Sequence, residues 1–139
     1  MIVLDTNVVS EGMKPSADPA ATAWLDARDA GSIYVSSVTL AELSFGINCL
    51  PTGRRKRALA MALDEVLGVF GDRALAFDAR AARAYAHIAV RARAAGLGLP
   101  IPDGYIAAIA AAHGFAVAPR DTGPFQAAGV AVIDPWVLT

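Results

Sequence analysis

The sequence predicts an α/β fold in which a mostly parallel sheet of about five strands is flanked by helices. Short apolar runs alternate with longer helical stretches, which is the pattern of parallel strands joined by helical crossovers. A chain of 139 residues that is 55% hydrophobic is long and apolar enough to bury one sizeable core. Its sequence shows neither an internal repeat nor a linker-like stretch, so we expect a single domain over residues 1–139.

The strands are predicted from five short apolar runs that are bounded by polar or turn-forming residues. Runs of this length fit strands buried on both faces, as they are in a parallel sheet. They cover residues 2–4, 33–35, 75–77, 115–118 and 130–133.

The helices are predicted from residues that favour helix ends. We expect a turn of helix after Asp5, and a helix that begins at the pair Asp18 and Pro19, runs through residue 30 and stops at Gly31. A Ser, Thr or Asp stands at the start of each further helix. These helices are expected after Ser36 or Ser37 to residue 48, after Thr52 to about 68, after Asp78 to 95, and from near Asp103 to 113, where Gly114 follows.

The composition argues against a membrane protein and a disulfide-bonded protein. No apolar run approaches the roughly 20 residues that span a bilayer, and residues 2–4 are too short for a signal peptide. Cys49 is the single cysteine, which excludes an internal disulfide and a zinc site built from cysteines. We therefore expect a cytoplasmic protein. Its net charge of −1 does not by itself indicate nucleic-acid binding.

Four carboxylates stand beside apolar segments that must be largely buried. Charged carboxylates are rarely buried unless they are paired or bound to a metal. In parallel α/β sheets the carboxyl ends of the strands share one rim, where ligands collect and helices begin. We expect the four to meet there and to need a cation, and oxygen ligands indicate Mg²⁺ or Mn²⁺. They are Asp5, Glu42, Asp103 and Asp121.

Each of these acids also has a simpler explanation when it is considered alone. Asp5 and Asp103 suit the start of a helix, and Asp121 with its two successors resembles a turn. Glu42 is harder to explain in this way, because its helical neighbours are apolar and a solvated helix face would be more polar. The hypothesis of a metal-dependent site that cleaves phosphodiesters therefore depends on the four acids together.

Five motifs in order along the chain resemble the PIN-domain family, and more narrowly its VapC-type, FitB-like toxins. They read Ile-Val-Leu-Asp-Thr-Asn at 2–7, Ser-Val-Thr-Leu-Ala-Glu-Leu at 37–43, Pro-Asp-Gly-Tyr-Ile-Ala-Ala at 102–108, Arg-Asp-Thr-Gly-Pro-Phe at 120–125, and Val-Ala-Val-Ile-Asp-Pro-Trp at 130–136. The resemblance implies a Mg²⁺- or Mn²⁺-dependent endoribonuclease that forms a homodimer. It also implies inhibition by a small DNA-binding antitoxin, so that contact with DNA is indirect.

The resemblance also implies roles for individual residues. The four acids match the acidic quartet of the family, all of them as catalytic and metal-binding residues. Asp5 and Asp103 would contact the metal directly, Glu42 would orient a water molecule or act as base, and Asp121 would complete a second, weaker ion position. Thr6 and Asn7 match a polar pair that supports the first acid. The sequence departs from the family at Pro119, where a Ser or Thr is common, which removes a hydroxyl and an N–H near Asp121.

Three alternative functions remain open from the sequence. Asp5 suits the nucleophile of a phosphotransferase, although such sites usually carry a second acid two residues later, where Asn7 stands. A non-catalytic module that dimerises or binds a partner is a second alternative, but it would not need four mutually repelling acids. Cleavage of flap or structured DNA in place of RNA is the third.

Overall fold

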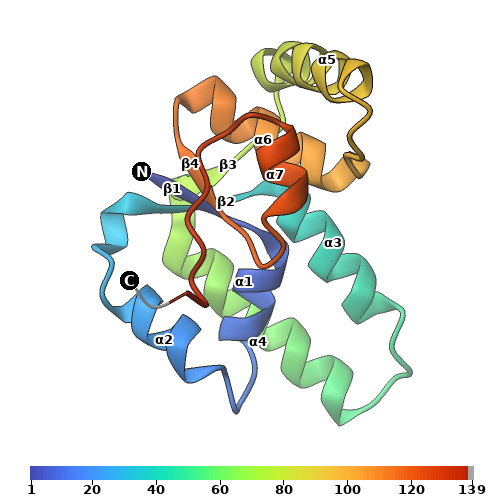
Figure 1. Ribbon diagram of the computed structural model, residues 1–139. Coiled ribbons are helices and arrows are strands. Elements are labelled where there is room, and N and C mark those ends of the chain that lie inside the picture. Colours follow the sequence, from blue (N-terminus) through green and yellow to red (C-terminus); the bar gives the residue numbers. More distant parts are fainter. Residues whose placement is uncertain (138–139) are drawn as a thin grey trace.

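The computed structural model describes residues 1–137 and contains a four-stranded sheet covered by helices (Figure 1). All three strand pairs are parallel. This confirms the predicted α/β class with a parallel sheet. The last two residues of the predicted domain lie outside the described residues. The strands lie in the order β3-β2-β1-β4, with the bounds Ile2–Leu4 for β1, Ile33–Ser36 for β2, Ala74–Leu75 for β3 and Ala116–Ala118 for β4.

The fifth predicted strand contributes only one bridge to this sheet. Val132 pairs in parallel with Val117, and the flanking bonds run from Val117 N to Ala131 O and from Ile133 N to Val117 O, both 2.9 Å long. The third strand is also shorter than predicted, because the N–H of Phe77 donates to the Ser37 hydroxyl at 3.1 Å. About five strands therefore become four strands and a bridge.

Helices occupy most of the remaining chain, and three of the predicted caps are present. The Asp18 side chain accepts from the N–H groups of Ala20 and Ala21, while Ser36 and Asp78 each accept from the N–H three residues later. The α-helices are α1 (Thr6–Gly12), α2 (Pro19–Asp26), α3 (Ser37–Asn48), α4 (Arg54–Phe70), α5 (Ala79–Ala94), α6 (Ile101–His113) and α7 (Gly123–Ala127), and two 3₁₀ turns span Ala30–Ser32 and Gly71–Arg73.

Several helix ends differ from the prediction. Helix α2 ends at Asp26, four residues early, and α4 is preceded by Gly53 without any side-chain cap from Thr52. Helix α6 begins before Asp103, and Pro102 occupies its first turn. Proline is tolerated there because N–H groups of the first turn have no partner within the helix. Asp103 therefore lies inside the first turn and is not the cap. Helix α7 was not predicted, since its five residues follow a sequence that resembles a turn.

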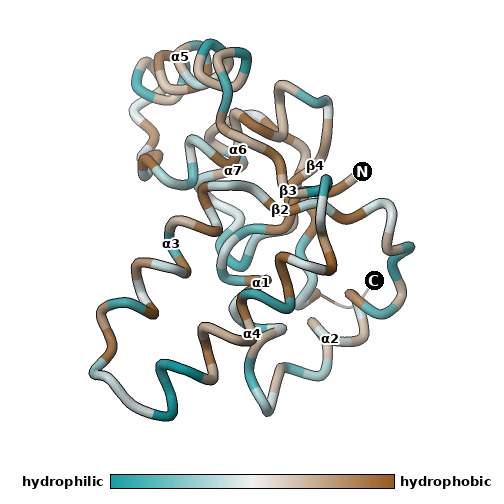
Figure 2. The backbone as a smooth tube through the Cα atoms, turned by 180° about the vertical axis from the view of Figure 1, so that it is seen from behind, coloured by the Kyte–Doolittle hydropathy of each residue, from teal (hydrophilic) through white to brown (hydrophobic). Residues whose placement is uncertain are grey.

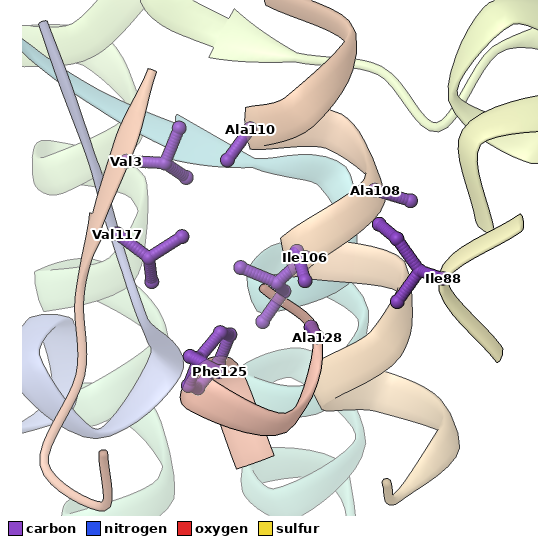
Figure 3. Close-up of a cluster of buried hydrophobic side chains, with 9 residues drawn as sticks. Val3, Ile88, Ile106, Ala108, Ala110, Val117, Phe125 and Ala128 are labelled. Atoms are coloured by element: carbon purple, nitrogen blue, oxygen red, sulfur yellow. The ribbon is translucent and has the colours of Figure 1, made fainter. Parts of the chain in front are cut away.

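The core consists of two hydrophobic clusters to which β1 contributes alternate residues. Val3 belongs to one cluster, which also holds Ile106 from α6 and Phe125 from α7 (Figure 3). Ile2 and Leu4 belong to the other cluster. Because successive side chains on a strand point to opposite faces, β1 is buried on both sides. This burial fixes the carboxyl end of β1, where Asp5 follows.

The polar residues lie outside these clusters. Figure 2 shows hydrophobic strands within the molecule and hydrophilic residues at the start of α4. Among residues 1–137 there is no helix that is long and apolar enough to cross a membrane.

The contact between α5 and α6 yields a testable prediction at Gly104. A Cβ added there would lie 2.8 Å from Cε1 of Tyr85, whose ring packs edge-on against Tyr105 at 4.8 Å. We expect Gly104→Ala to lower the free energy of unfolding by about 1–3 kcal/mol, the usual cost of overpacking. Gly68→Ala in α4 is the control, because its Cβ meets no atom within 4 Å, and we expect a gain of about 0.5–1 kcal/mol. Urea denaturation measures both, and equal stability of the two variants would contradict the prediction.

Candidate active site

Asp5 is held at the carboxyl end of β1 by bonds from both its backbone and its side chain. Its N–H donates to the carbonyl of Ala118 at 3.0 Å, which extends the pairing of β1 with β4 by one residue. Its Oδ1 accepts from the N–H of Thr6 at 2.7 Å, where α1 begins. The residue is only 3% exposed. The sheet therefore positions one carboxylate in a largely buried place.

Burial and neighbouring charges raise the pKa of Asp5 from 3.8 to about 6. Burial is the largest cause, because it penalises the charged form. The N–H of Thr6 acts in the opposite direction, while the carboxylates of Asp103 and Glu42 raise the pKa further and the backbone N–H of Arg120 lowers it. Asp103 and Glu42 are therefore close enough to Asp5 for their charges to affect its ionisation.

Glu42 lies in the second turn of α3 and is tied to α1 through a threonine. The Thr6 hydroxyl donates to Oε1 of Glu42 at 2.6 Å and lies 3.0 Å from the Thr39 hydroxyl. A hydroxyl has one proton, and an ionised carboxylate can only accept. Thr6 therefore accepts from Thr39 and donates to Glu42 when Glu42 is ionised. Thr6 supports the first acid by its backbone and the second acid by its side chain.

Asp103 and Asp121 complete the set from the other side of β1. Asp103 lies in the first turn of α6, and burial, then Glu42, then Asp121 raise its pKa. Asp121 is exposed in the loop after β4, where its Oδ1 accepts from the N–H of Gly123 at 3.1 Å. The bond to Gly123 is that of a turn, as the simpler explanation of Asp121 expected.

The four acids are close enough to influence one another, but they do not form a compact ligand cluster. Within the described residues no group of three His, Cys, Asp or Glu side chains stands in an arrangement that could hold a metal ion. The donor chemistry nevertheless fits a hard divalent cation, because all the candidate ligands are carboxylate oxygens. Burial and the neighbouring carboxylates raise the pKa values of Asp5 and Asp103, so a bound cation would favour their charged forms.

The remaining sequence expectations concern Asn7 and Pro119. Asn7 is exposed on α1 and lines a polar cavity of about 470 Å³, and no bond joins its side chain to Asp5 among the interactions of residues 1–137. Pro119 is fully buried directly after β4. A Ser or Thr at position 119 would have to fit this buried place. In this chain Asp121 accepts a hydrogen bond from the N–H of Gly123.

Two buried hydroxyl residues lie near the site, of which the sequence named Ser36 only as a possible helix cap and did not single out Thr39. The Thr39 hydroxyl contacts the Thr6 hydroxyl. The Ser36 hydroxyl donates to the Thr39 hydroxyl at 3.5 Å and accepts from the Thr39 N–H at 3.1 Å. Both are at most 3% exposed. The hydroxyl residues at the start of the segment that carries Glu42 could have indicated this contact. A Ser that caps a helix accepts from the N–H of the residue three positions later, which here is Thr39.

Comparison with known proteins shows similarity over almost the entire chain. A family model described as PIN domain matches residues 2–130. The VapC ribonuclease Y4jK of Sinorhizobium fredii is 48% identical over 137 residues, 98% of either chain, and the toxin FitB of Neisseria gonorrhoeae is 44% identical over 98% of this chain and 99% of its own. A solved structure of FitAB bound to the IR36 DNA fragment has a TM-score of 0.94 at 42% identity and covers 100% of this chain and 98% of that chain.

The raised pKa of Asp5 predicts that stability falls with rising pH in the presence of EDTA. The folded state binds the Asp5 proton more tightly than the unfolded state, so its contribution is complete below pH 3.8 and is lost as the pH rises through about 6. Two pKa units correspond to roughly 3 kcal/mol. We expect Asp5→Asn, which can still accept from Thr6, to be more stable than the wild type at pH 8 and to lose less stability between pH 4 and pH 8.

Urea denaturation at a series of pH values measures this difference. Saturating Mn²⁺ should stabilise the wild type at pH 8 much more than the Asp5→Asn variant, because a ligand that binds only the folded state adds to its stability. Identical pH dependence of the two proteins in EDTA would show that ionised Asp5 carries no such cost.

Proposed function

This chain belongs to the PIN-domain family, and we propose that it is a Mg²⁺- or Mn²⁺-dependent endoribonuclease, the toxin of a toxin–antitoxin pair. The observation that carries the proposal is the mutual electrostatic influence of four carboxylates, of which Asp5 is buried at the carboxyl end of β1. Relatives of 48% and 44% identity over nearly the full length are called a VapC ribonuclease and a toxin.

In this proposal Asp5, Glu42, Asp103 and Asp121 hold the metal, with Asp5 and Asp103 as direct ligands. When bound, the cation would supply the Lewis acidity that makes a water molecule more acidic and offsets the charge developing on the scissile phosphate. The oxygen-only donor set and the burial and mutual repulsion that raise the pKa values of Asp5 and Asp103 support this assignment. The full domain over residues 1–139 is the proposed unit of activity.

The protein residues would orient the groups that act on the substrate. The Thr6 hydroxyl donates to Oε1 of Glu42 at 2.6 Å, which fixes the orientation of the carboxylate. Oε2 is then the atom that would accept a proton from water. Asp5 is fixed through Thr6 and Ala118, so its position does not depend on solvent. Asp121 is exposed and suits an outer position that contacts the ion and substrate more loosely.

The substrate class that suits this site is single-stranded RNA. The site stands at the surface rim of the sheet, and bases in loops can be splayed out and contacted there, unlike bases inside an A-form duplex. Arg and Lys contacts to phosphates would hold the strand. Cleavage of cellular RNA implies a cytoplasmic location, which stays a prediction.

The proposed antitoxin has a candidate docking groove next to the acids. A groove of about 560 Å³ between α1, α3 and α4 is lined by apolar residues that include Leu43, Ile47, Leu50 and Leu59, and Glu42 stands at its edge. This supports the prediction that helices over residues 40–50 and 59–67 receive an amphipathic segment of the antitoxin. An Arg after that segment would be placed among Asp5, Glu42 and Asp103, since guanidinium groups pair bidentately with carboxylates.

Two further partner expectations follow from the family. A small DNA-binding antitoxin would make any contact with DNA indirect, and the solved FitAB structure contains a DNA fragment. The homodimer stays a prediction that light scattering measures.

Metal-dependent cleavage is the central prediction. We expect a single-stranded RNA to be cut with Mg²⁺ or Mn²⁺ and to stay intact in EDTA. Asp103→Asn should lower the rate by about 100-fold or more, because losing even a residue that supports a ligand costs roughly 10–100-fold. Asp64→Asn removes an exposed acid of α4 and is the matched control, with the wild-type rate expected.

The same assay separates the alternatives. Full activity in EDTA or in Asp103→Asn would contradict the metal nuclease. Cleavage of flap DNA but not RNA would favour the DNA nuclease, and a phosphorylated Asp5 would favour the phosphotransferase. A protein that binds a partner without cleaving any nucleic acid would favour the non-catalytic module.

The antitoxin proposal predicts that binding and inhibition can be separated. Replacing the docking Arg of the antitoxin by Ala should restore RNA cleavage in the complex, because the carboxylates become free to bind metal. Much of the affinity should remain in the apolar groove. Calorimetry measures binding and the RNA assay measures inhibition. A complex that stays fully inhibited with its acids open to solvent would show that inhibition acts elsewhere.

A further inference from the structure

A site of four carboxylates repels the phosphates of RNA, so a cation must hold the strand beside it. We propose that Arg120, stacked on Trp136, binds the RNA phosphate that neighbours the scissile one. This inference rests on the proposed function and assigns a substrate-binding residue to it. Arg120 would position the strand and would not take part in bond cleavage.

Arg120 directly precedes Asp121 in the chain, and its backbone lies close to Asp5. It follows the buried Pro119 at the end of β4. Its backbone N–H acts on the Asp5 carboxylate, and the carbonyl of Ala118, two residues earlier, accepts from the Asp5 N–H at 3.0 Å. The backbone of Arg120 is therefore fixed relative to Asp5.

The guanidinium of Arg120 is held by an aromatic ring. Its Cζ lies 4.3 Å from the centroid of Trp136, within the range of a cation–π contact. Trp136 packs against the cluster of Ile2 and Leu4, and its N–H donates to Oδ1 of Asp134 at 2.9 Å. A guanidinium stacked in this way keeps its N–H edges for an anion and loses less entropy on binding.

The acids near Arg120 are already engaged by other groups. Oε2 of Glu11 accepts from Lys14 at 2.8 Å, and its Oε1 accepts from the Asp18 N–H at 2.8 Å. The Asp18 carboxylate caps α2. In the described part of the chain Arg120 forms no ion pair, although its charge contributes to the lowered pKa of Glu11. Its charge is therefore available to a ligand.

A polar cavity lies beside Arg120 and reaches Asn7, the second residue after Asp5. It has a volume of about 470 Å³, which lies within the range of small-ligand sites. Two cations and two acids line it together with Trp136 and two neutral polar residues: Arg120, Lys14, Glu11, Asp18, Asn7 and Ser10. Asn7 follows Thr6, the residue that contacts both Asp5 and Glu42. In this proposal the strand runs from the acids past Asn7 to Arg120.

The chemistry of the cavity favours a phosphate over a peptide or a stacked base. A planar guanidinium binds phosphate oxygens in bidentate fashion. The lining has few apolar residues to anchor a peptide side chain, and the guanidinium covers the face of Trp136 on which a base would stack.

The test uses the full chain and a labelled single-stranded RNA. Binding is measured by fluorescence anisotropy in EDTA over a series of salt concentrations, and cleavage is measured in Mg²⁺. We expect Arg120→Gln to raise KM about tenfold with little change in kcat, because a ground-state contact is lost. The slope of log K against log salt should fall by about 0.7, the value for one phosphate of a single strand. Arg120→Lys should restore part of the affinity.

Arg28→Gln is the matched control. Arg28 also stacks on a tryptophan, Trp24, at 5.0 Å, but it lines a different cavity beside α2 and α4. We expect wild-type KM and salt slope for this variant. Trp136→Phe should keep most of the affinity and Trp136→Leu should lose as much as Arg120→Gln, with thermal melts reporting the fold.

The outcomes separate this inference from the proposed function. Wild-type cleavage together with an unchanged KM and salt slope in Arg120→Gln would overturn the assignment of Arg120 and leave the nuclease intact. Weaker antitoxin binding with unchanged RNA binding would also overturn it, because the pair would then serve the protein partner. A wild type that neither binds nor cleaves RNA would overturn both.

Discussion

The hydrogen bond from the Asp5 N–H to the Ala118 carbonyl is the constraint on which the candidate site depends. It continues the pairing of β1 and β4 past the last strand residue, so that Asp5 and the segment after β4 leave the sheet at the same level. Because β1 is buried on both faces, this level cannot shift without exposing core residues. The sheet register therefore fixes the spacing between the first acid, Arg120 and Asp121.

A chain of hydroxyl groups then connects the sheet to the second acid. Ser36 ends β2, contacts Thr39 in α3, and Thr39 in turn contacts Thr6 at the start of α1, which donates to Glu42. Each hydroxyl has one proton, so an ionised Glu42 at one end fixes the direction of every bond. Loss of one hydroxyl would leave a buried neighbour without its partner, which links the fold of α3 to the orientation of Glu42.

The sequence predicted the parallel α/β arrangement and the mutual electrostatic influence of the acids, because both follow from local patterns. Asp5 ends a short apolar strand, and parallel strands bring their carboxyl ends to one rim. The sequence did not predict the role of Thr39, because a hydroxyl inside an apolar helix signals nothing until its neighbour from α1 is known. It also did not predict that residues 130–133 contribute a single bridge or that α6 begins before Asp103. Those features depend on tertiary contacts and on two prolines that fit equally well before a helix and within its first turn.

The candidate acids differ in how deeply they are buried. Asp5 is 3% exposed, Asp103 is partly buried and Asp121 is exposed, and burial is the largest cause of the raised pKa values of Asp5 and Asp103. A cation that relieves the repulsion would gain most at Asp5, where the charge is least solvated, and least at Asp121, where water already screens it. The same gradient explains why a cation at the loop end is useful to a polyanionic ligand. Arg120 stands at the exposed end, where it would meet a phosphate without neutralising the buried acid that we propose as a metal ligand.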